Sequence, residues 1–301
     1  MRIVFIVNNK NNRLAKVLPG ILEYCRAYFS DNVSFGYTEG KSHAIELAKQ
    51  LTEAGCDYLI AMGGDGTLHE VLNGVLQSNA PAEKYPVIGL LPMGSANDFA
   101  RTAGLSKSIK SLTKLIENKC IQKIDLGKIN FEENGEARYF ANIAGIGLGP
   151  EVVQGMERSP AFVGPKLRYF TQIVKGFLKY RKKEVCITGN SQVWKGKLLQ
   201  MAVANGRYYG YGICTAPDAD LTDGFFQIAI FGDLSIWDYL KNTGNLKKGI
   251  KIRHKEVNYF KLKKIKIESN EPCGIEADGE YAGRLPVTIT ILPKAISFLM
   301  P

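Results

Sequence analysis

The sequence predicts an α/β domain built on a parallel sheet, followed by a β-rich domain that forms an antiparallel sandwich. Two patterns carry this prediction. Short apolar runs alternate with helical patterns through residues 1–124, whereas closely spaced β runs separated by turn residues fill most of residues 125–292. The chain of 301 residues is also about twice as long as a common domain, so two domains are expected.

Four continuous apolar runs in the first half have the character of strands buried on both faces of a sheet. They cover residues 2–7, 33–38, 57–62 and 86–91. Apolar residues recur at helical spacing over residues 14–29, 44–51, 66–76, 95–101 and 109–118. Because helices and strands alternate, the sheet is expected to be parallel with helices on both of its faces.

The second half is expected to be mostly antiparallel, because turn residues separate its short β runs. The expected strands are residues 124–131, 137–144, 185–188, 197–205, 225–232, 257–268, 275–277 and 285–292. Two helical stretches interrupt them, at residues 165–183 and roughly 236–241. We expect a sandwich over residues 125–292.

The charge of the chain is unevenly distributed. The net charge is +10, and residues 1–125 hold 14 basic and 12 acidic side chains, against 25 and 17 in residues 126–301. Such a field favours nucleic acid, an acidic membrane surface or phosphorylated ligands. Nucleic acid is disfavoured, because only Tyr259 and Phe260 interleave the basic stretch 241–266.

Composition and cysteine spacing exclude several classes of protein. A hydrophobic fraction of 45% and a charged fraction of 23% are those of an ordinary globular protein. The six cysteines are scattered singly, without the C-x-x-C spacing of a zinc or redox site. No apolar run approaches the roughly 20 residues of a membrane span, and no signal peptide is recognisable. A reduced, cytoplasmic protein is expected.

The strongest local motif is Gly63-Gly64-Asp65-Gly66-Thr67, between an expected strand and an expected helix. Glycines at a strand end let the backbone approach a phosphate, and the helix that follows offers free N–H groups. Asp65 then suggests contact with Mg²⁺ or acceptance of a proton from an attacking hydroxyl. The alternative is a tight glycine turn in which Asp65 caps the helix.

A second polar cluster, Pro92-Met93-Gly94-Ser95-Ala96-Asn97-Asp98-Phe99-Ala100-Arg101, follows the next expected strand. Pro92 and Gly94 shape the turn. Ser95 is expected to cap a helix whose first turn holds Asn97 and Asp98.

These two blocks, GGDGTLHEVLNG and PMGSANDFAR, resemble the catalytic domain of the diacylglycerol kinase family, which includes bacterial lipid kinases and sphingosine and ceramide kinases. Residues 8–13 look like an altered form of that family's first phosphate loop, and Thr38, His43 and Ala44 match its T-x-x-x-x-H-A segment. The resemblance implies that ATP binds near strand ends of one sheet. The implied nucleotide residues are Asn8, Thr38, Gly63, Gly64, Asp65, Gly66, Thr67, His69, Glu70, Ser95 and Asn97. For Glu70, a solvated helix position is the alternative.

Further along, residues 216–225 are similar to the family's A-P-x-A-x-x-x-D-G-x segment, which forms a structural Mg²⁺ site in related bacterial lipid kinases. The carboxylates of Asp220 and Asp223, with a backbone carbonyl from Phe225, are the implied ligands. A simple Asp-Gly hairpin turn explains Asp223 and Gly224 but not Asp220.

Residues 276–280 resemble the family's D-G-E motif, and the resemblance implies that one of its carboxylates accepts the proton of the attacking hydroxyl. Family comparison points to Glu280 or Asp278, and the sphingosine kinase branch points to Asp65 instead. A hairpin turn at Asp278 and Gly279 is the alternative. The tail at about 293–301 resembles that of bacterial members, which implies that it folds back onto the domain of residues 1–124.

The sequence as a whole predicts an ATP- and Mg²⁺-dependent lipid kinase that phosphorylates a hydroxyl of diacylglycerol or a similar lipid. The stretch 165–183 has seven Lys/Arg, no acidic residue and apolar residues at helical spacing, which favours peripheral contact with an anionic membrane or, equally, a helix packed on the sheet. A homodimer is left open. The alternatives are an NAD kinase-like enzyme with a soluble substrate and an inactive nucleotide-binding regulatory protein.

Overall fold

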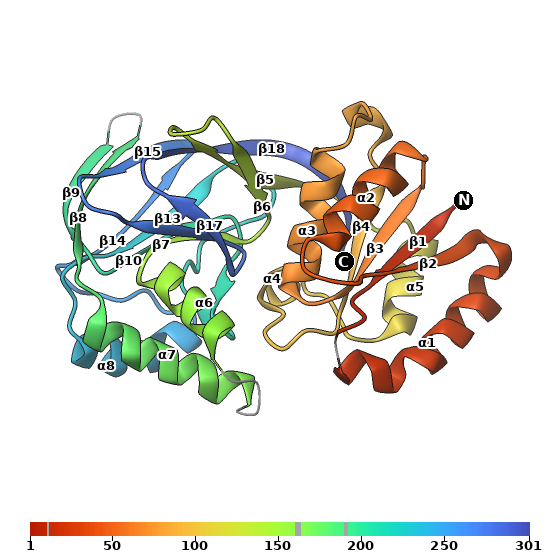
Figure 1. The fold of residues 1–301 in the computed structure, drawn as a ribbon, viewed down its shortest axis with the longest axis horizontal. Helices are drawn as coiled ribbons and strands as arrows, with labels where there is room; N and C mark the ends of the chain where they lie inside the picture. Colours follow the sequence, from red (N-terminus) through yellow and green to blue (C-terminus); the bar gives the residue numbers. More distant parts are fainter. Residues whose placement is uncertain (11, 160–163, 190–191) are drawn as a thin grey trace. The chain divides into compact units, whose positions relative to one another are not determined.

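The computed structural model describes residues 1–10, 12–159, 164–189 and 192–301. The chain forms two compact units (Figure 1). The first contains residues 1–124 and 294–301, and the second contains residues 125–293. Asn11, which belongs to the expected first phosphate loop, lies outside the described residues.

The first unit is built on a parallel sheet, as the sequence predicts. Its strands lie in the order β2 (Val33–Tyr37), β1 (Ile3–Val7), β3 (Tyr58–Gly63) and β4 (Val87–Pro92). At the β4 edge the sheet is extended by the end of β18 (Val287–Leu299), where Phe298 pairs in parallel with Ile88. All side chains of β1 and β3 are buried, which explains their continuous apolar runs.

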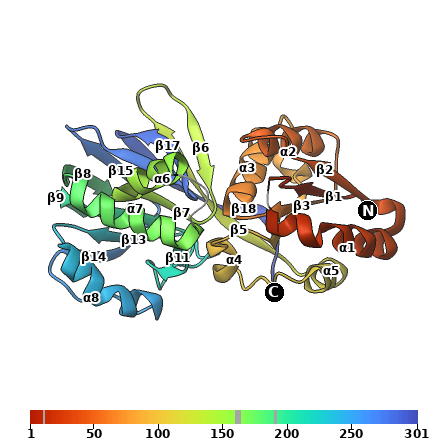
Figure 2. The same ribbon diagram turned by 60° about the horizontal axis from the view of Figure 1, so that its bottom comes forward.

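Helices cover both faces of this parallel sheet (Figure 2). On one face, α1 (Asn12–Phe29) and α5 (Ile109–Glu117) pack against apolar side chains of β1 and β3. On the other face lie α2 (His43–Glu53) and α3 (Asp65–Leu76), followed in the chain by the short helix α4 (Asp98–Thr102). The predicted α/β class is therefore confirmed.

The second unit is an antiparallel β-sandwich. One sheet has the order β14 (Val257–Leu262), β13 (Phe226–Phe231), β10 (Gln200–Ala204), β7 (Ile143–Gly147), β16 (Gly274–Ala277) and β17 (Glu280–Arg284). The other contains β18, β15 (Lys264–Ser269), β8 (Lys183–Gly189) and β9 (Gln192–Leu198), with β5 (Ile121–Phe131) and β6 (Ala137–Phe140) alongside β18. Side chains of both sheets, such as Ile146, Ile228, Ile187 and Ile267, form one buried core. A short hairpin pairs β11 (Tyr208–Tyr209) with β12 (Ile213–Cys214).

Three runs that the sequence analysis treats as single strands are each two strands. Residues 137–144 contain β6 and β7, residues 197–205 contain β9 and β10, and residues 257–268 contain β14 and β15. In every case the first strand and the second belong to opposite sheets of the sandwich. The chain crosses between the sheets over only one or two residues (Ala141 and Asn142, Leu199, and Lys263), so no longer turn segment marks the corner in the sequence.

Three helices lie together on the outer face of the six-stranded sheet (Figures 1 and 2). They are α6 (Leu148–Arg158), which the sequence analysis missed, α7 (Pro165–Lys179) and α8 (Ile236–Lys247). Val152 of α6, Phe177 of α7 and Leu246 of α8 join a second apolar cluster with residues of that sheet. Across the described ranges, no helix is both long enough and apolar enough to span a bilayer.

Candidate functional site

Two glycine-containing loops of the first unit lie in backbone contact. The carbonyl of Gly63 accepts the N–H groups of Met93, at 2.7 Å, and Gly94, at 3.1 Å. A Cβ added to Gly94 would lie 2.4 Å from the Cα of Gly64, and one added to Gly64 would lie 3.0 Å from the Cα of Gly94. The two motifs found in the sequence therefore form one surface at the ends of β3 and β4, and neither glycine can carry a side chain without separating the loops.

Asp65 holds these two loops together. Its carboxylate oxygens accept the N–H groups of Asp98, at 3.2 Å, and Phe99, at 3.0 Å, so Asp65 caps α4 although it belongs to α3. The expectation that Ser95 caps a helix over residues 95–101 was wrong, because α4 begins at Asp98. Asn97 precedes it in the left-handed conformation, with φ 54°, and directs its side-chain amide to the carbonyl of Gly94 at 2.9 Å.

The remaining strand-end loops of this unit are linked by side-chain hydrogen bonds. Asn8, directly after β1, donates through Nδ2 to Oγ1 of Thr67 at 3.0 Å. The hydroxyl of Thr38, directly after β2, accepts the N–H of Asn9 at 3.4 Å. The structure thus brings together Asn8, Thr38 and Thr67, as the strand order predicts for residues at one edge of a parallel sheet.

Glu70 connects α3 to the start of α2. Its two carboxylate oxygens accept the N–H groups of Ser42, at 2.9 Å, and Ala44, at 3.1 Å. The N-cap residue of α2, Ser42, makes no side-chain cap of its own, so Glu70 satisfies the free amides of that helix. Glu70 is therefore not a solvated helix residue, because its carboxylate is bonded to the start of α2.

His69 and Asn97 are buried, as are the predicted nucleotide residues Thr38 and Thr67. His69 is 4% exposed, with Nε2 lying 3.5 Å from Nδ2 of Asn73. Asn97 is 6% exposed, and its Oδ1 has no hydrogen-bond partner among the described residues. Ser95, by contrast, is exposed.

In the second unit, Asp278 anchors the D-G-E turn. Its Oδ1 accepts the N–H groups of Asn142, at 2.9 Å, and Ile143, at 3.1 Å, and its Oδ2 accepts that of Ala141 at 2.9 Å. Asp278 itself has a positive φ of 51°. The next carboxylate, Glu280, is half-buried at the start of β17. The turn between β16 and β17 therefore uses one acid of the motif to hold its shape, and the other acid is the first residue of β17.

Glu276, which the sequence analysis did not single out, is fully buried in β16. Its Oε2 accepts the N–H of Gly279 at 2.7 Å, closing the same turn from inside. Burial raises the pKa of this carboxyl to about 8, although hydrogen bonds from Gly279 and Tyr209 oppose the shift. The signal available in the sequence was an acidic residue inside the otherwise apolar strand Gly274–Ala277, because acidic side chains are rarely fully buried unless they are paired.

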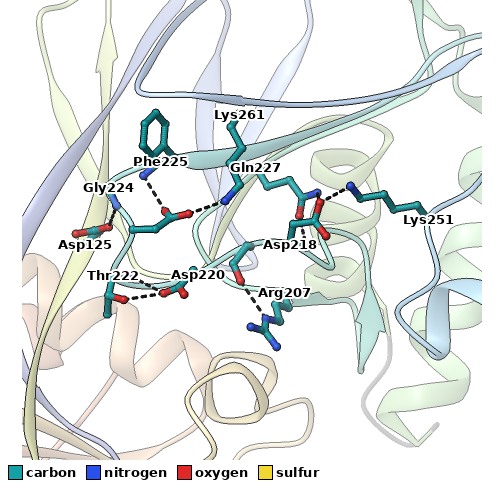
Figure 3. A network of polar contacts seen from close by, with 12 residues as sticks. Asp125, Arg207, Asp218, Asp220, Thr222, Gly224, Phe225, Gln227, Lys251 and Lys261 are labelled. Atoms are coloured by element: carbon teal, nitrogen blue, oxygen red, sulfur yellow. Dashed lines mark hydrogen bonds and ion pairs between the residues drawn. The ribbon is translucent and has the colours of Figure 1, made fainter.

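The three predicted metal ligands lie in an aspartate-rich loop, defined here as residues 216–225 (Figure 3). Oδ1 of Asp220 accepts the N–H, at 2.9 Å, and the hydroxyl, at 2.8 Å, of Thr222. Oδ1 of Asp223 accepts the N–H of Phe225 at 2.9 Å, and its Oδ2 pairs with Nζ of Lys261 at 2.6 Å. Among the described residues, no group of three or more acidic, histidine or cysteine side chains is arranged to hold a metal ion. In this arrangement the loop does not fit a divalent ion, because a lysine lies where the ion would bind Asp223.

The predicted basic helix, α7, exposes apolar as well as basic side chains. Tyr169, Ile173 and Phe177 pack toward the sheet, whereas Leu167, Phe170 and Leu178 are 59%, 52% and 78% exposed. On the neighbouring α8, Trp237 is 69% exposed and Leu240 is 43% exposed, and the two helices touch through the rings of Phe177 and Tyr239, whose centroids lie 5.2 Å apart. One side of this helix is therefore packed on the sheet and the other is apolar and exposed, and membrane contact stays a prediction.

Comparison with known proteins gives matches to both units. Residues 2–129 match the diacylglycerol kinase catalytic domain, and residues 144–300 match the YegS C-terminal NAD kinase beta sandwich-like domain. A diacylglycerol kinase of Staphylococcus carnosus is 30% identical over 304 residues, which cover 100% of this chain and 94% of the relative. The Bacillus subtilis diacylglycerol kinase is 29% identical over 274 residues, covering 88% and 87% of the two chains.

Solved structures show the same fold. The crystal structure of a diacylglycerol kinase from Bacillus anthracis aligns with a TM-score of 0.72 and 22% identity, over 100% of this chain and 97% of that one. The fold and the paired loops thus define a two-domain kinase with an NAD kinase-like sandwich. Within that class, the chain belongs to the diacylglycerol kinase family, whose members are lipid kinases that use ATP.

Proposed function

We propose that this lipid kinase transfers the γ-phosphoryl group of ATP to a hydroxyl of diacylglycerol or a closely similar lipid. The observation that carries the proposal is the joined pair of glycine loops, in which the backbone at Gly64 and Gly94 is partly accessible at the strand ends. Such a surface suits a polyphosphate, because backbone N–H groups can approach its oxygens closely. The relatives' names supply the lipid class.

The predicted nucleotide residues fall into two groups: accessible residues, and residues that are buried or hold the loops in place. Gly64, Gly66 and Ser95 are accessible and are proposed to contact the phosphates. Asp65 and Glu70 are proposed as positioning residues, because their carboxylates already hold the starts of α4 and α2. The same holds for the enclosed residues Thr38, Thr67, His69 and Asn97. Asn8 contributes through its bond to Thr67.

For the proton of the attacking hydroxyl, Glu280 is the proposed acceptor. Asp278 holds three backbone amides and Asp65 holds two, so a proton on either carboxylate would weaken the bonds that shape its loop. Glu280 begins β17 directly beside that anchored turn. Mg²⁺ bound with ATP would neutralise the phosphate oxygens during transfer.

The proposed activity is tested by supplying labelled ATP with diacylglycerol in mixed micelles, with ceramide, with sphingosine and with NAD as separate acceptors. We expect label in diacylglycerol and at most weak label elsewhere. Transfer to NAD in preference to every lipid would favour the NAD kinase alternative. No transfer to any acceptor, with ATP binding retained, would favour the regulatory alternative.

We further propose that α7 and α8 make peripheral contact with an anionic membrane. The exposed Leu178 and Phe170 of α7 lie on a helix whose exposed charged residues, such as Lys175 and Lys179, are all basic. Sedimentation with vesicles that contain phosphatidylglycerol measures this contact. Leu178→Ser should weaken it several-fold, whereas Val193→Ser, at a 72% exposed apolar residue of β9, should not. Equal losses would contradict the placement. The homodimer stays a prediction, to be checked by light scattering.

A further inference from the structure

The aspartate-rich loop is surrounded by basic side chains from three other parts of the second unit (Figure 3). Lys261, on β14, pairs with Asp223 at 2.6 Å. Lys251, before β14, pairs with Asp218. Arg207, before β11, donates through Nε to the carbonyl of Ala219 at 2.9 Å. Cationic side chains therefore already bind the carboxylate of Asp223, a predicted cation ligand, and the carbonyl of Ala219.

The loop is also held by hydrogen bonds that require no ion. The fully buried Asp125 accepts the N–H of Gly224 at 2.6 Å through its carboxylate, and its own N–H donates to the carbonyl of Leu221 at 2.7 Å. At the other side, Gln227 binds Asp218 twice: its Oε1 accepts the N–H at 2.7 Å, and its Nε2 donates to the carboxylate at 3.2 Å. The buried Asp125 thus holds one end of the loop, and the neutral side chain of Gln227 holds the other.

The register of the sheet fixes the lysine in this place. Lys261 of β14 lies directly opposite Gln227 of β13, and β13 begins at Phe226, three residues after Asp223. Asp223 is 27% exposed and Lys261 is 43% exposed, so the pair lies at the edge of solvent and its ammonium can reach the carboxylate without full desolvation. Nζ of the neighbouring Lys263 lies 4.6 Å from the centre of the Phe225 ring, which adds a second positive charge beside the loop.

A divalent ion at Asp223 would have to displace the Lys261 ammonium, and the ammonium of Lys263 lies against Phe225, the residue whose carbonyl is the predicted third ligand. Binding is therefore unfavourable, because it breaks an existing ion pair and brings the ion toward a further positive charge. We propose that Lys261 provides the positive charge that the aspartate-rich loop requires, so that in this protein the loop folds and stays ordered without a bound divalent cation. The Mg²⁺ requirement of the enzyme is then limited to the ion that accompanies ATP.

The test measures thermal unfolding of the whole protein without nucleotide, first in EDTA and then in about 5 mM MgCl₂. For the unaltered chain we expect the two midpoints to agree within about one degree. Lys261→Met should lower the midpoint in EDTA by about 2–4 °C, and Mg²⁺ should then restore part of the loss because Asp223 becomes available. Lys261→Arg should behave as the unaltered chain does. Lys264→Met is the matched control, because Lys264 is an exposed lysine of β15 that pairs with Thr290.

Binding of Mn²⁺ followed by electron paramagnetic resonance gives a second readout that does not depend on stability. We expect a new Mn²⁺ site in Lys261→Met that disappears when Asp223→Asn is added. A midpoint of the unaltered chain that rises in Mg²⁺ and loses this response in Asp223→Asn would overturn the proposal. So would a Lys261→Met protein that is as stable as the unaltered chain in EDTA and binds no Mn²⁺. Because neither readout uses phosphoryl transfer, failure here would leave the proposed kinase activity untouched.

Discussion

The candidate loops of the two units are held by different forces. In the first unit, glycine backbones lie against each other at Gly64 and Gly94, the part-buried carboxylate of Asp65 binds two backbone amides beside them, and the surrounding domain carries almost no net charge. In the second, Asp278 likewise binds backbone amides in the D-G-E turn, but the aspartate-rich loop is held in addition by the partly exposed ion pair between Lys261 and Asp223. Close packing of backbones is insensitive to salt and pH, whereas bonds to exposed charges respond to both. The two units should therefore respond to different perturbations.

The largest effect is expected at Glu280. Glu280→Gln removes the proposed proton acceptor while keeping the shape of the side chain, and kcat should fall by about 10²- to 10⁴-fold. Initial rates of lipid phosphorylation at saturating ATP measure it. Glu133→Gln, at an exposed carboxylate of the loop after β5, serves as control and should leave kcat within about twofold. An unchanged kcat in Glu280→Gln would contradict the proposal and favour Asp278 or Asp65 as the proton acceptor.

A smaller effect, on stability, is expected at Glu276. Its pKa is raised to about 8 in the folded protein by burial, against 4.5 for an ordinary glutamate. Between these two values the folded form keeps the proton that the unfolded chain releases, so stability falls as pH rises from about 4.5 to about 8 and then levels off. The contribution is on the order of a few kcal/mol.

Glu276→Gln cannot ionise, so its stability should lack this fall. Urea unfolding at pH 5.0, 6.5 and 8.5 gives the free energy of unfolding of both proteins. As the pH rises, the stability of the variant relative to the unaltered chain should increase. Besides burial, the groups that shift the pKa of Glu276 are Asp278, Tyr209 and the backbones of Gly279 and Gly145, and of these only Asp278 adds a negative charge. A pH-independent difference between the two proteins would show that Glu276 is ionised in the fold.

In the first unit, Gly94→Ala should cost about 1–3 kcal/mol of stability, because its Cβ would lie 2.4 Å from the Cα of Gly64. Separating the loops should also weaken ATP binding by at least about tenfold, which calorimetric titration measures. Gly20→Ala is the control, since a Cβ there meets nothing within 4 Å and lies in α1. ATP affinity equal to that of the unaltered chain in Gly94→Ala would mean that the joined loops do not form the phosphate site.

The smallest effect is expected at the basic helix. Lys175→Gln on α7 should weaken binding to anionic vesicles by about 1 kcal/mol, or roughly fivefold. Raising the salt concentration should weaken vesicle binding more than ATP binding, because exposed charges are screened and backbone contacts are not. Equal weakening of both would remove the distinction between the two units.

The sequence predicted the first unit more completely than the second, and the reason is physical. Strand ends in a parallel sheet meet at one edge, so strand order alone brings Asn8, Thr38 and Thr67 together. In the sandwich, partners come from strands far apart in sequence, such as Asp223 and Lys261, and their pairing depends on a register that no local pattern displays. The sheet-to-sheet corners near residues 141 and 263 were also hidden, because only one or two residues separate the consecutive strands there.

The roles of the motif acids were the other part that the sequence could not give. Asp65, Glu70 and Asp278 stand out as carboxylates in recognisable motifs, yet each holds backbone amides of a segment elsewhere in the chain. A cap supplied by the residue next to a helix is visible in sequence, and a cap supplied from another helix is not.

The central claim is that the two units contribute separate functions, with the nucleotide held by the first and the proton accepted by the second. The most direct measurement is the affinity of Glu280→Gln for ATP, determined by calorimetric titration under the conditions in which its kcat is measured. The account predicts a dissociation constant within about twofold of the unaltered chain beside a kcat reduced by at least about 100-fold. A loss of ATP affinity as large as the loss of kcat would contradict it.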